Sequence, residues 1–299
     1  MTMTIFLAAV DAAGRSLYDT ADEVLFPWWS VTKTAIAALM LCDAERGRVD
    51  LDAPLPGRPF TLRQLLQHRA GLGDYGSLPA YQMAVAADED PWPVDELMRR
   101  AGARTLRYMP GTRWAYSNIG YLLLRQVLEQ THNAPLAALL QQEICQPLGL
   151  SARLAETRAD FAALAWPAAR RYHPGWVYHG CLIGTAREAA LMMQAVLEGE
   201  ILSPDMRALM RAPAMQAPAV PGRPWSAIGY GMGLMLGEAP GLGAAIGHAG
   251  GGPFAANYVG SFPEGAPGVT VAAFGAGPDS APAEEAAIAL ARELAAPPR

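Results

Sequence analysis

The chain has 299 residues, of which 52% are hydrophobic and 17% are charged, so it is long and apolar enough to bury a sizeable core. This composition excludes a disordered chain, and no apolar stretch approaches the roughly 20 residues of a membrane helix. The formal net charge is −5 and the arginines are scattered, so we expect neither a nucleic acid nor a membrane as a partner.

The first part of the chain predicts strands followed by helices. Residues 4–20 predict two short strands around a turn. From Ser30 onward, apolar residues follow helical spacing up to Gly47, a glycine of the kind that ends helices, so Ser30 lies at a predicted helix N-terminus. Helical periodicity then recurs between glycine and proline breaks at residues 61–69, 93–102, 118–131, 134–144, 186–199 and 203–213.

The last part of the chain changes character beyond Pro221. Short, glycine-bounded apolar runs predict antiparallel strands, and residues 282–296 predict an amphipathic helix. The proline-rich residues 211–225 are predicted to form a surface connection. We therefore predict an α/β (α+β) fold in which strands from both chain ends form one antiparallel sheet with flanking helices, and an all-helical lobe is inserted. The predicted strands are residues 227–237, 243–251, 255–263 and 268–277.

Lys33 is the only lysine of the chain, so the other 22 of its 23 cationic residues are arginines. It follows Ser30 by three positions, which places both side chains on one helix face. A serine hydroxyl needs a base to become a nucleophile, and a buried lysine can lose its proton whereas an arginine cannot. A Ser-x-x-Lys pattern alone could also be two exposed side chains on a helix surface. Because Lys33 is the only lysine, we favour the interpretation in which Ser30 is a nucleophile and Lys33 its base.

Two further segments carry candidate residues. Tyr116 and Asn118 precede a predicted helix and can point into one cleft, although a core tyrosine and a helix-capping asparagine are the alternative. Gly250 and Gly251 in a predicted strand would let a substrate approach backbone N–H groups, as an oxyanion hole requires. A glycine-rich bulge is the alternative there.

The order and spacing of these motifs resemble the serine beta-lactamase and penicillin-binding-protein superfamily, in particular its class C beta-lactamase, DD-peptidase and family VIII esterase branch. The resemblance implies a beta-lactamase/transpeptidase-like fold with the active site between two lobes. It also implies that Ser30 is acylated, that Lys33 is its proton partner and that Tyr116 is a base in the proton relay. The similar segments are residues 30–55, 61–72, 110–124, 184–204 and 230–236.

The same resemblance assigns substrate-binding residues. Asn118 would orient the acyl side, and the N–H groups of Ser30 and Gly251 would form the oxyanion hole. His248, followed by Ala249 and Gly250, stands where the superfamily has a Lys-Thr-Gly triplet. Ala249 has no hydroxyl and a neutral imidazole has no charge, so recognition of a substrate carboxylate is in question.

The resemblance therefore implies one catalytic domain over residues 1–299, with residues 1–50 and 221–299 in an α/β lobe and residues 51–220 in a mainly helical lobe. The expected activity is that of a cytoplasmic serine esterase or amidase that acts on a small ester or amide. A beta-lactamase, a D-alanyl-D-alanine carboxypeptidase or D-aminopeptidase-type peptidase, an acyltransferase and a non-catalytic domain are the alternatives. The acyl group, the leaving group and the oligomeric state stay open.

We expect neither a cofactor nor a metal. Nucleotide-binding glycine motifs are missing from the sequence, and His173, His179 and Cys181 match no metal-ligand spacing. We expect these three residues to line the cleft or to pack, and we assign no chemistry to His68. An odd number of widely spaced cysteines and a first segment without signal-peptide features favour the cytoplasm.

Overall fold

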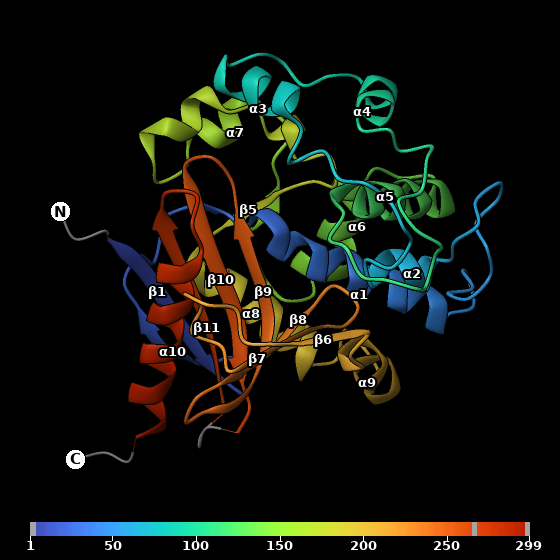
Figure 1. The fold of residues 1–299 in the computed structure, drawn as a ribbon. Coiled ribbons are helices and arrows are strands. Elements are labelled where there is room, and N and C mark those ends of the chain that lie inside the picture. The colour runs from blue at the N-terminus through green and yellow to red at the C-terminus, as the bar shows by residue number, and fades with distance from the viewer. Residues whose placement is uncertain (1–3, 265–267, 297–299) are drawn as a thin grey trace.

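A large antiparallel sheet runs through the part of the chain that the structure, a computed structural model, describes, residues 4–264 and 268–296 (Figure 1). Its spatial order is β2-β1-β11-β10-β9-β8-β7-β6, so the first strands of the chain lie next to the last. The eight strands are β1 (Ile5–Asp11), β2 (Ser16–Asp19), β6 (Met215–Pro218), β7 (Ala227–Tyr230), β8 (Met235–Ala239), β9 (Gly243–Gly251), β10 (Ala255–Phe262) and β11 (Val269–Ala276).

The pairing of β1 with β11 joins the two chain ends. Ile5 lies opposite Gly275 and Asp11 opposite Val269 in an antiparallel register. Because both faces of the sheet are covered, β10 is buried along its whole length, including its polar residues Asn257 and Ser261. The prediction of one sheet built from both chain ends with flanking helices is confirmed.

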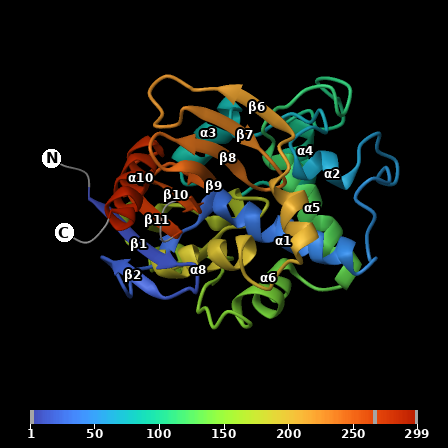
Figure 2. The ribbon, with the colours of Figure 1, turned by 90° about the horizontal axis from the view of Figure 1, so that it is seen from below.

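Helices cover the two faces of this sheet (Figure 2). On one face, α10 (Ala281–Ala295) packs on β10 and β11, and on the other face α8 (Ala186–Leu197) packs on β1 and β11, with α1 (Thr32–Glu45) behind it. The alternation of β11 follows this arrangement, since Val271 faces the α10 side and Phe274 the α1 and α8 side.

Of the remaining helices, α5 (Asn118–His132) packs against α1 and α2 (Leu62–Leu66) on the side of α1 away from the sheet, whereas α3 and α7 lie near the upper ends of β9 and β10 in Figure 1. A separate antiparallel sheet of β3 (Phe26–Pro27), β5 (Leu182–Gly184) and β4 (Arg153–Leu154) joins the helical region to the residues before α1. The helices are α2 (Leu62–Leu66), α3 (Pro79–Ala86), α4 (Val94–Arg100), α5 (Asn118–His132), α6 (Leu136–Leu140), α7 (Arg158–Ala162) and α9 (Pro204–Arg211). The 3₁₀ turns are η1 (Trp29–Val31), η3 (Pro167–Arg171) and η4 (Pro174–Trp176), and η2 (Gln141–Cys145) is a π-helical turn.

The proline-rich residues 211–225 lie mostly at the surface, as predicted for a connection, but they also contain β6, a strand that the sequence did not predict. This strand pairs with β7 and forms the edge of the sheet, where the missing N–H of Pro218 costs no hydrogen bond. The division into lobes at residues 50 and 220 stays a prediction. Within residues 4–264 and 268–296, no helix has the length and apolar composition required to cross a bilayer.

Candidate active site

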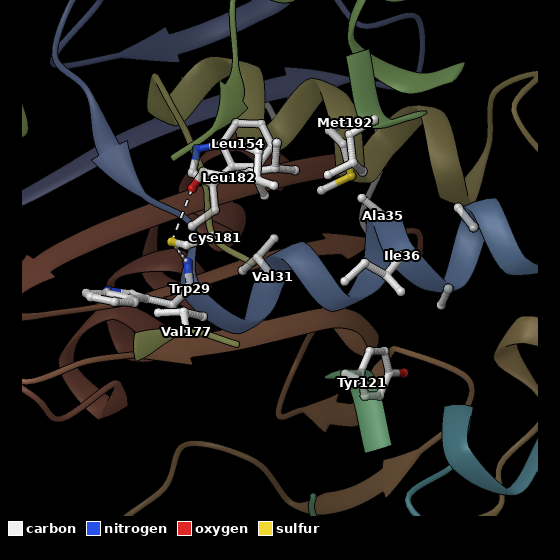
Figure 3. Packing of buried hydrophobic residues seen from close by; sticks show 14 of the residues in the cluster. Trp29, Val31, Ala35, Ile36, Tyr121, Leu154, Val177, Cys181, Leu182 and Met192 are labelled. Carbon is white, nitrogen blue, oxygen red and sulfur yellow. Dashed lines mark hydrogen bonds between the residues drawn. The ribbon is translucent and has the colours of Figure 1, made fainter. Parts of the chain in front are cut away.

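Ser30 lies in a tight turn held by its neighbours. It belongs to η1, directly before α1, and the preceding Trp29 adopts a left-handed backbone with φ of 46°, which is unusual for a large side chain. The N–H of Trp29 donates to Sγ of Cys181 at 3.3 Å (Figure 3), and its buried ring packs edge-on against Phe254. This packing fixes the backbone from which the hydroxyl of Ser30 projects.

Lys33 is completely buried in the first turn of α1. Its Nζ lies 2.9 Å from Oγ of Ser30, 2.8 Å from Oδ1 of Asn118 and 3.0 Å from Nε2 of His179. Burial lowers the pKa of Lys33 well below its ordinary value, and the carboxylate of Asp74 opposes part of that shift. The structure thus joins two predicted residues, Ser30 and Lys33, and places an amine that readily loses its proton beside a hydroxyl.

Asn118 is the first residue of α5, and Asp74 fixes the orientation of its amide. One carboxylate oxygen of Asp74 accepts the backbone N–H of Asn118 at 2.7 Å, and the other accepts Nδ2–H at 3.3 Å. The amide oxygen is therefore left to face Lys33. Ser117, not Asn118, caps the helix, since its hydroxyl accepts the N–H of Gly120 at 3.2 Å.

Tyr116 lies half-buried beside Lys33 and His68. The centroid of its ring is 5.2 Å from Nζ of Lys33 and 4.2 Å from the ring centroid of His68. Burial raises the pKa of Tyr116 above its ordinary range, and the interaction with the hydroxyl of Ser30 opposes that shift. The phenol is therefore protonated at neutral pH.

His248 belongs to a buried chain of hydrogen bonds whose directions follow from one fixed donor. The backbone N–H of Ser117 donates to Nδ1 of His68, so Nε2 of His68 carries the proton and donates to the hydroxyl of Tyr230 at 3.1 Å. That hydroxyl donates to Nε2 of His248 at 3.0 Å, and Nδ1–H of His248 donates to the carbonyl of Ala249. Burial lowers the pKa of His248 to about 3, so the ring is neutral. Both of its nitrogens are engaged within the protein.

Gly250 and Gly251 end β9 beside the turn that holds Ser30. A Cβ at Gly250 would lie 2.7 Å from Oδ1 of Asn257 and 2.9 Å from Cβ of Trp29, so a larger residue would push the strand away. Gly251 is exposed at the end of the strand and lines a cavity together with Ser30. Gly250 thus allows β9 to lie close to the turn that holds Ser30, while the approach of a substrate to the backbone N–H groups stays a prediction.

This cavity has a volume of about 640 Å³. Ser30, Asn118 and Gly251 of the predicted residues line it, and so does His179. Six of its 21 lining residues are aromatic, which suits an apolar ligand with few polar groups. The aromatic lining residues are Trp29, Tyr75, Tyr81, Tyr172, Trp176 and Phe254.

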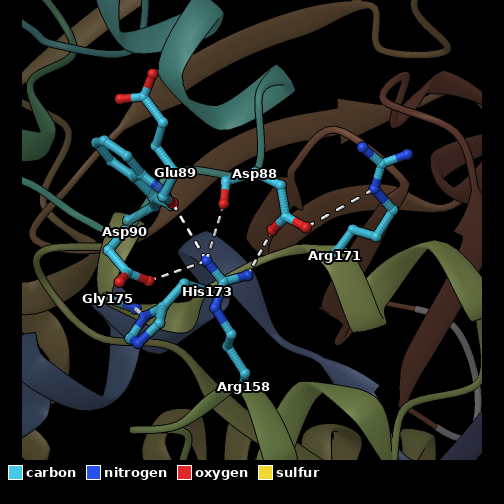
Figure 4. A network of polar contacts seen from close by, with 8 residues as sticks. Asp88, Glu89, Asp90, Arg158, Arg171, His173 and Gly175 are labelled. Carbon is cyan, nitrogen blue, oxygen red and sulfur yellow. Dashed lines mark hydrogen bonds and ion pairs between the residues drawn. The ribbon is translucent and has the colours of Figure 1, made fainter.

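A charged network includes two residues of the cavity wall, Asp88 and Arg171 (Figure 4). Arg158 donates to Oδ1 of Asp88 at 2.5 Å and to Oδ1 of Asp90 at 3.0 Å, and it thereby ties the residues after α3 to α7. Nε of Arg171 lies 3.9 Å from Oδ2 of Asp88, and its side chain is 75% exposed. Asp88 and Arg171 both line the cavity, so its wall carries one charge of each sign.

The three residues considered for a metal lie in different environments. His173 accepts the N–H of Gly175 through Nδ1, His179 faces Lys33, and Cys181 accepts the N–H of Trp29. In the described part of the chain, no group of three or more His, Cys, Asp or Glu side chains could hold a metal ion. The sequence interpretation missed the contacts of His179 and Asp74, because no local pattern links either residue to Lys33 or Asn118.

Comparisons with known proteins agree with this architecture. A family model described as Beta-lactamase matches residues 9–296. The esterase EstB of Burkholderia gladioli is 33% identical over 158 residues, which are 46% of this chain and 39% of the relative. A D-aminopeptidase of Gluconobacter oxydans is 31% identical over 151 residues, which are 46% of this chain and 27% of the relative. Each of these alignments spans less than half of the relative's length.

Among solved structures, a D-stereospecific amidohydrolase from a Streptomyces species superposes with a TM-score of 0.74 and 24% sequence identity. The superposition covers 95% of this chain and 93% of that protein. At this identity the likeness shows the fold, and the predicted beta-lactamase/transpeptidase-like fold is confirmed.

Proposed function

The chain belongs to the beta-lactamase family, and on that premise we propose that it is a serine hydrolase that forms an acyl-enzyme on Ser30. The observation that carries the proposal is the contact of 2.9 Å between Oγ of Ser30 and the buried Nζ of Lys33. A serine hydroxyl becomes nucleophilic when an adjacent base accepts its proton. Lys33 can be that base because burial favours its neutral amine.

In the proposed acylation, the proton of Ser30 moves to Nζ of Lys33 while Oγ forms a bond to the substrate carbonyl carbon. The carbonyl oxygen becomes an oxyanion, which the N–H groups of Ser30 and Gly251 would stabilise. When the oxyanion collapses, the bond to the leaving group breaks and the leaving group takes up the proton. Water then attacks the carbonyl carbon of the acyl-enzyme ester and gives up a proton. The bond between this carbon and Oγ of Ser30 breaks, Oγ regains a proton, and the acid is released.

Tyr116 acts in this scheme as a neutral phenol that donates a proton or hydrogen bond. The raised pKa of Tyr116 disfavours a resting phenolate, so the resting base is assigned to Lys33. Asn118 holds Lys33 through its amide oxygen and orients the acyl side of the substrate from the cavity wall.

The substrate we propose is a small neutral ester or amide with an apolar, preferably aromatic, acyl group. The aromatic residues of the cavity wall support this choice. His248 offers no free hydrogen-bond donor, since Tyr230 and Ala249 engage both of its nitrogens. A carboxylate anchor at the place of the Lys-Thr-Gly triplet is therefore not part of the proposal, and His248 is assigned to positioning within the protein.

A panel of p-nitrophenyl esters, from acetate to phenylacetate, tests this function. We expect burst release of p-nitrophenol, an acyl mass on Ser30 in intact-protein mass spectrometry, and a kcat/KM that rises with the size of the apolar acyl group. Ser30→Ala should abolish all three. No Ser30-dependent turnover of any ester or amide would remove the hydrolase proposal.

Amide hydrolysis is the second candidate, because relatives include a D-aminopeptidase and a D-stereospecific amidohydrolase. The cavity accommodates a phenylalanine-sized group, and Asp88 and Arg171 in its wall offer both charges to an amino acid derivative. Comparing kcat/KM for D-phenylalanine amide, L-phenylalanine amide and p-nitrophenyl phenylacetate separates the candidates. Stable labelling of Ser30 by fluorescent penicillin would instead favour a penicillin-recognising peptidase.

A cytoplasmic location is also proposed. The three cysteines, Cys42, Cys145 and Cys181, are free buried thiols, which suits a reducing compartment. Fractionation of cells that produce the protein should recover it with cytoplasmic markers, and recovery in an exported fraction would reject this location.

A further inference from the structure

His179 contacts the proposed base and lines the same cavity as the nucleophile. It precedes β5, its side chain is 2% exposed, and Nε2 and Nδ1 lie 3.0 Å and 3.4 Å from Nζ of Lys33. A histidine that only packs in the core, or that binds a ligand at the surface, would not need to contact the only lysine of the chain.

We propose that His179 is a catalytic residue whose neutral ring, with its face towards Nζ of Lys33, accepts an N–H of Lys33 while Lys33 carries the proton taken from Ser30. The inference rests on the proposed function, in which Nζ is a reacting atom.

The inference follows from counting donors and acceptors around Nζ. An ammonium has three N–H donors, and two of its partners are Oγ of Ser30 at 2.9 Å and Oδ1 of Asn118 at 2.8 Å. The third is the ring of His179, whose nitrogens lie 3.0 Å and 3.4 Å from Nζ, so Nζ lies over the ring face. A neutral amine has two donors and one lone pair, and the lone pair must face the hydroxyl of Ser30 for the proton to move. The two remaining N–H groups then face Asn118 and His179, so His179 is an acceptor in both protonation states of Lys33.

This role requires a neutral imidazole, because a protonated one would repel the ammonium. Burial lowers the pKa of His179 well below its ordinary value, and the nearby Lys33, His248, Arg125 and His68 act in the same direction. The groups that face Lys33 itself include Asp74 and Cys181, which raise its pKa, and the rings of Tyr116 and Tyr121. His179 neither gains nor loses a proton during the cycle, so the proton balance of acylation is unchanged.

The sole lysine makes the contact directly measurable. Protein produced with lysine labelled by carbon-13 at Cε gives one lysine resonance in NMR, and its titration reports the pKa of Lys33. His179→Leu removes the acceptor, whereas His179→Gln places an amide oxygen near the position of Nε2. His173→Leu is the matched control, because His173 lies in the same segment and bonds the N–H of Gly175 instead of Lys33.

We expect the pKa of Lys33 to fall by about one unit or more in His179→Leu, since the ammonium loses a hydrogen bond. The acid limb of kcat/KM should move to lower pH by the same amount, and the burst rate at the optimum should fall about tenfold. His179→Gln should stay within about threefold of wild type, and His173→Leu should change neither the pKa nor the burst rate.

An unchanged or raised pKa of Lys33 in a folded His179→Leu protein would overturn the proposal, as would equal losses in His179→Gln and His179→Leu. If His179→Leu lacks a cooperative melt, His179→Met replaces it, because a thioether is a weak acceptor of similar volume. The NMR titration needs no substrate. A wild-type protein that hydrolyses nothing would therefore defeat the proposed function while the contact of His179 with Lys33 is still tested.

Discussion

Lys33 is enclosed on every side, and this enclosure explains why the chain keeps a lysine there while it uses arginine elsewhere. Its Nζ fits among Ser30, Asn118 and His179 at distances of 2.8 to 3.0 Å. A guanidinium is larger and planar, and it keeps its proton at all relevant pH values. Charge alone therefore cannot replace the amine.

We predict that Lys33→Arg lowers kcat/KM by a factor on the order of 10³ or more, close to the loss in Ser30→Ala. Ester hydrolysis by both variants would be compared after each shows a wild-type circular dichroism spectrum and a cooperative melt. A folded Lys33→Arg enzyme with near-normal turnover would contradict proton transfer through Lys33.

Asp74 acts on the reacting groups through Asn118 and through its charge. Its carboxylate accepts two hydrogen bonds from Asn118 and raises the pKa of Lys33. In Asp74→Asn the charge disappears, so the ammonium loses stabilisation and the pKa of Lys33 falls further. We predict that the acid limb of kcat/KM moves to lower pH and that turnover at the optimum falls about tenfold, as expected for a lost hydrogen bond to a charged group.

The pH profile distinguishes this role from a purely structural one. Asp95→Asn is the control, because Asp95 is exposed in the first turn of α4 and should leave the profile unchanged. A displacement of the acid limb to higher pH in Asp74→Asn would contradict the assigned role of its charge.

At the scale of elements, the end of β9 and the turn before α1 must approach closely. A Cβ on Gly250 would meet Asn257 and Trp29 at less than 3.0 Å, whereas a Cβ on Gly251 would have Pro278 as its nearest neighbour at 3.4 Å. We predict that Gly250→Ala lowers the free energy of unfolding by about 1 to 3 kcal/mol, the usual range for overpacking, and lowers turnover because β9 shifts from Ser30.

Gly251→Ala is the matched comparison within the same strand. It keeps the backbone N–H and meets only ordinary contacts, so its free energy of unfolding in urea should stay close to that of wild type. Equal losses of stability in the two variants would show that the approach of β9 does not depend on Gly250.

The elements also show what sequence patterns can predict. The long periodic segments of α1, α5, α8 and α10 follow the predicted ranges because each has one apolar face or a wholly apolar run to bury. Short elements such as α7 and β4 are stabilised by their neighbours and leave no periodic signal. β6 was missed because its proline, Pro218, is tolerated only at a sheet edge, and a sequence does not show which strand forms the edge.

The contacts of the candidate site also divide into those that local sequence predicts and those that arise only in the folded chain. Ser30 and Lys33 meet within one helical turn, so their spacing predicted their contact. His179 is 146 residues from Lys33 and Asp74 is 44 residues from Asn118, so these contacts exist only after the helices and the small sheet have packed. The lowered pKa of His248 likewise depends on burial and on the nearby Lys33, which no local pattern contains.

At the scale of the whole molecule, one buried ion pair joins the connection between β6 and β7 to the helix that covers the sheet. Glu284 of α10 is completely buried, and its carboxylate accepts hydrogen bonds from the guanidinium of Arg223 and, at 2.9 Å, from Nε1 of Trp225. Burial raises the pKa of Glu284, and the contact with Arg223 opposes that shift.

We predict that Arg223→Leu lowers the free energy of unfolding by about 3 kcal/mol at pH 8, because it leaves a buried carboxylate without its counterion. The pKa of Glu284 then rises further above its value in the unfolded chain. A raised folded-state pKa means that stability is retained at pH values below the unfolded pKa and is lost as the pH rises through the folded one. The deficit relative to wild type should therefore shrink when the pH is lowered from 8 to 5.

Urea denaturation of wild type, Arg223→Leu and Arg223→Leu/Glu284→Gln at both pH values measures this linkage. The double variant carries no buried charge, so it should recover part of the stability at pH 8 and show a weaker pH dependence than Arg223→Leu. Trp225 and the buried face of α10 pack in a different core cluster from Trp29 and Val31, the neighbours of Ser30, so kcat should stay within about twofold of wild type at temperatures where the variants are folded. A deficit in Arg223→Leu that is equal at pH 5 and pH 8 would mean that the lost contact, and not the uncompensated charge of Glu284, accounts for the destabilisation.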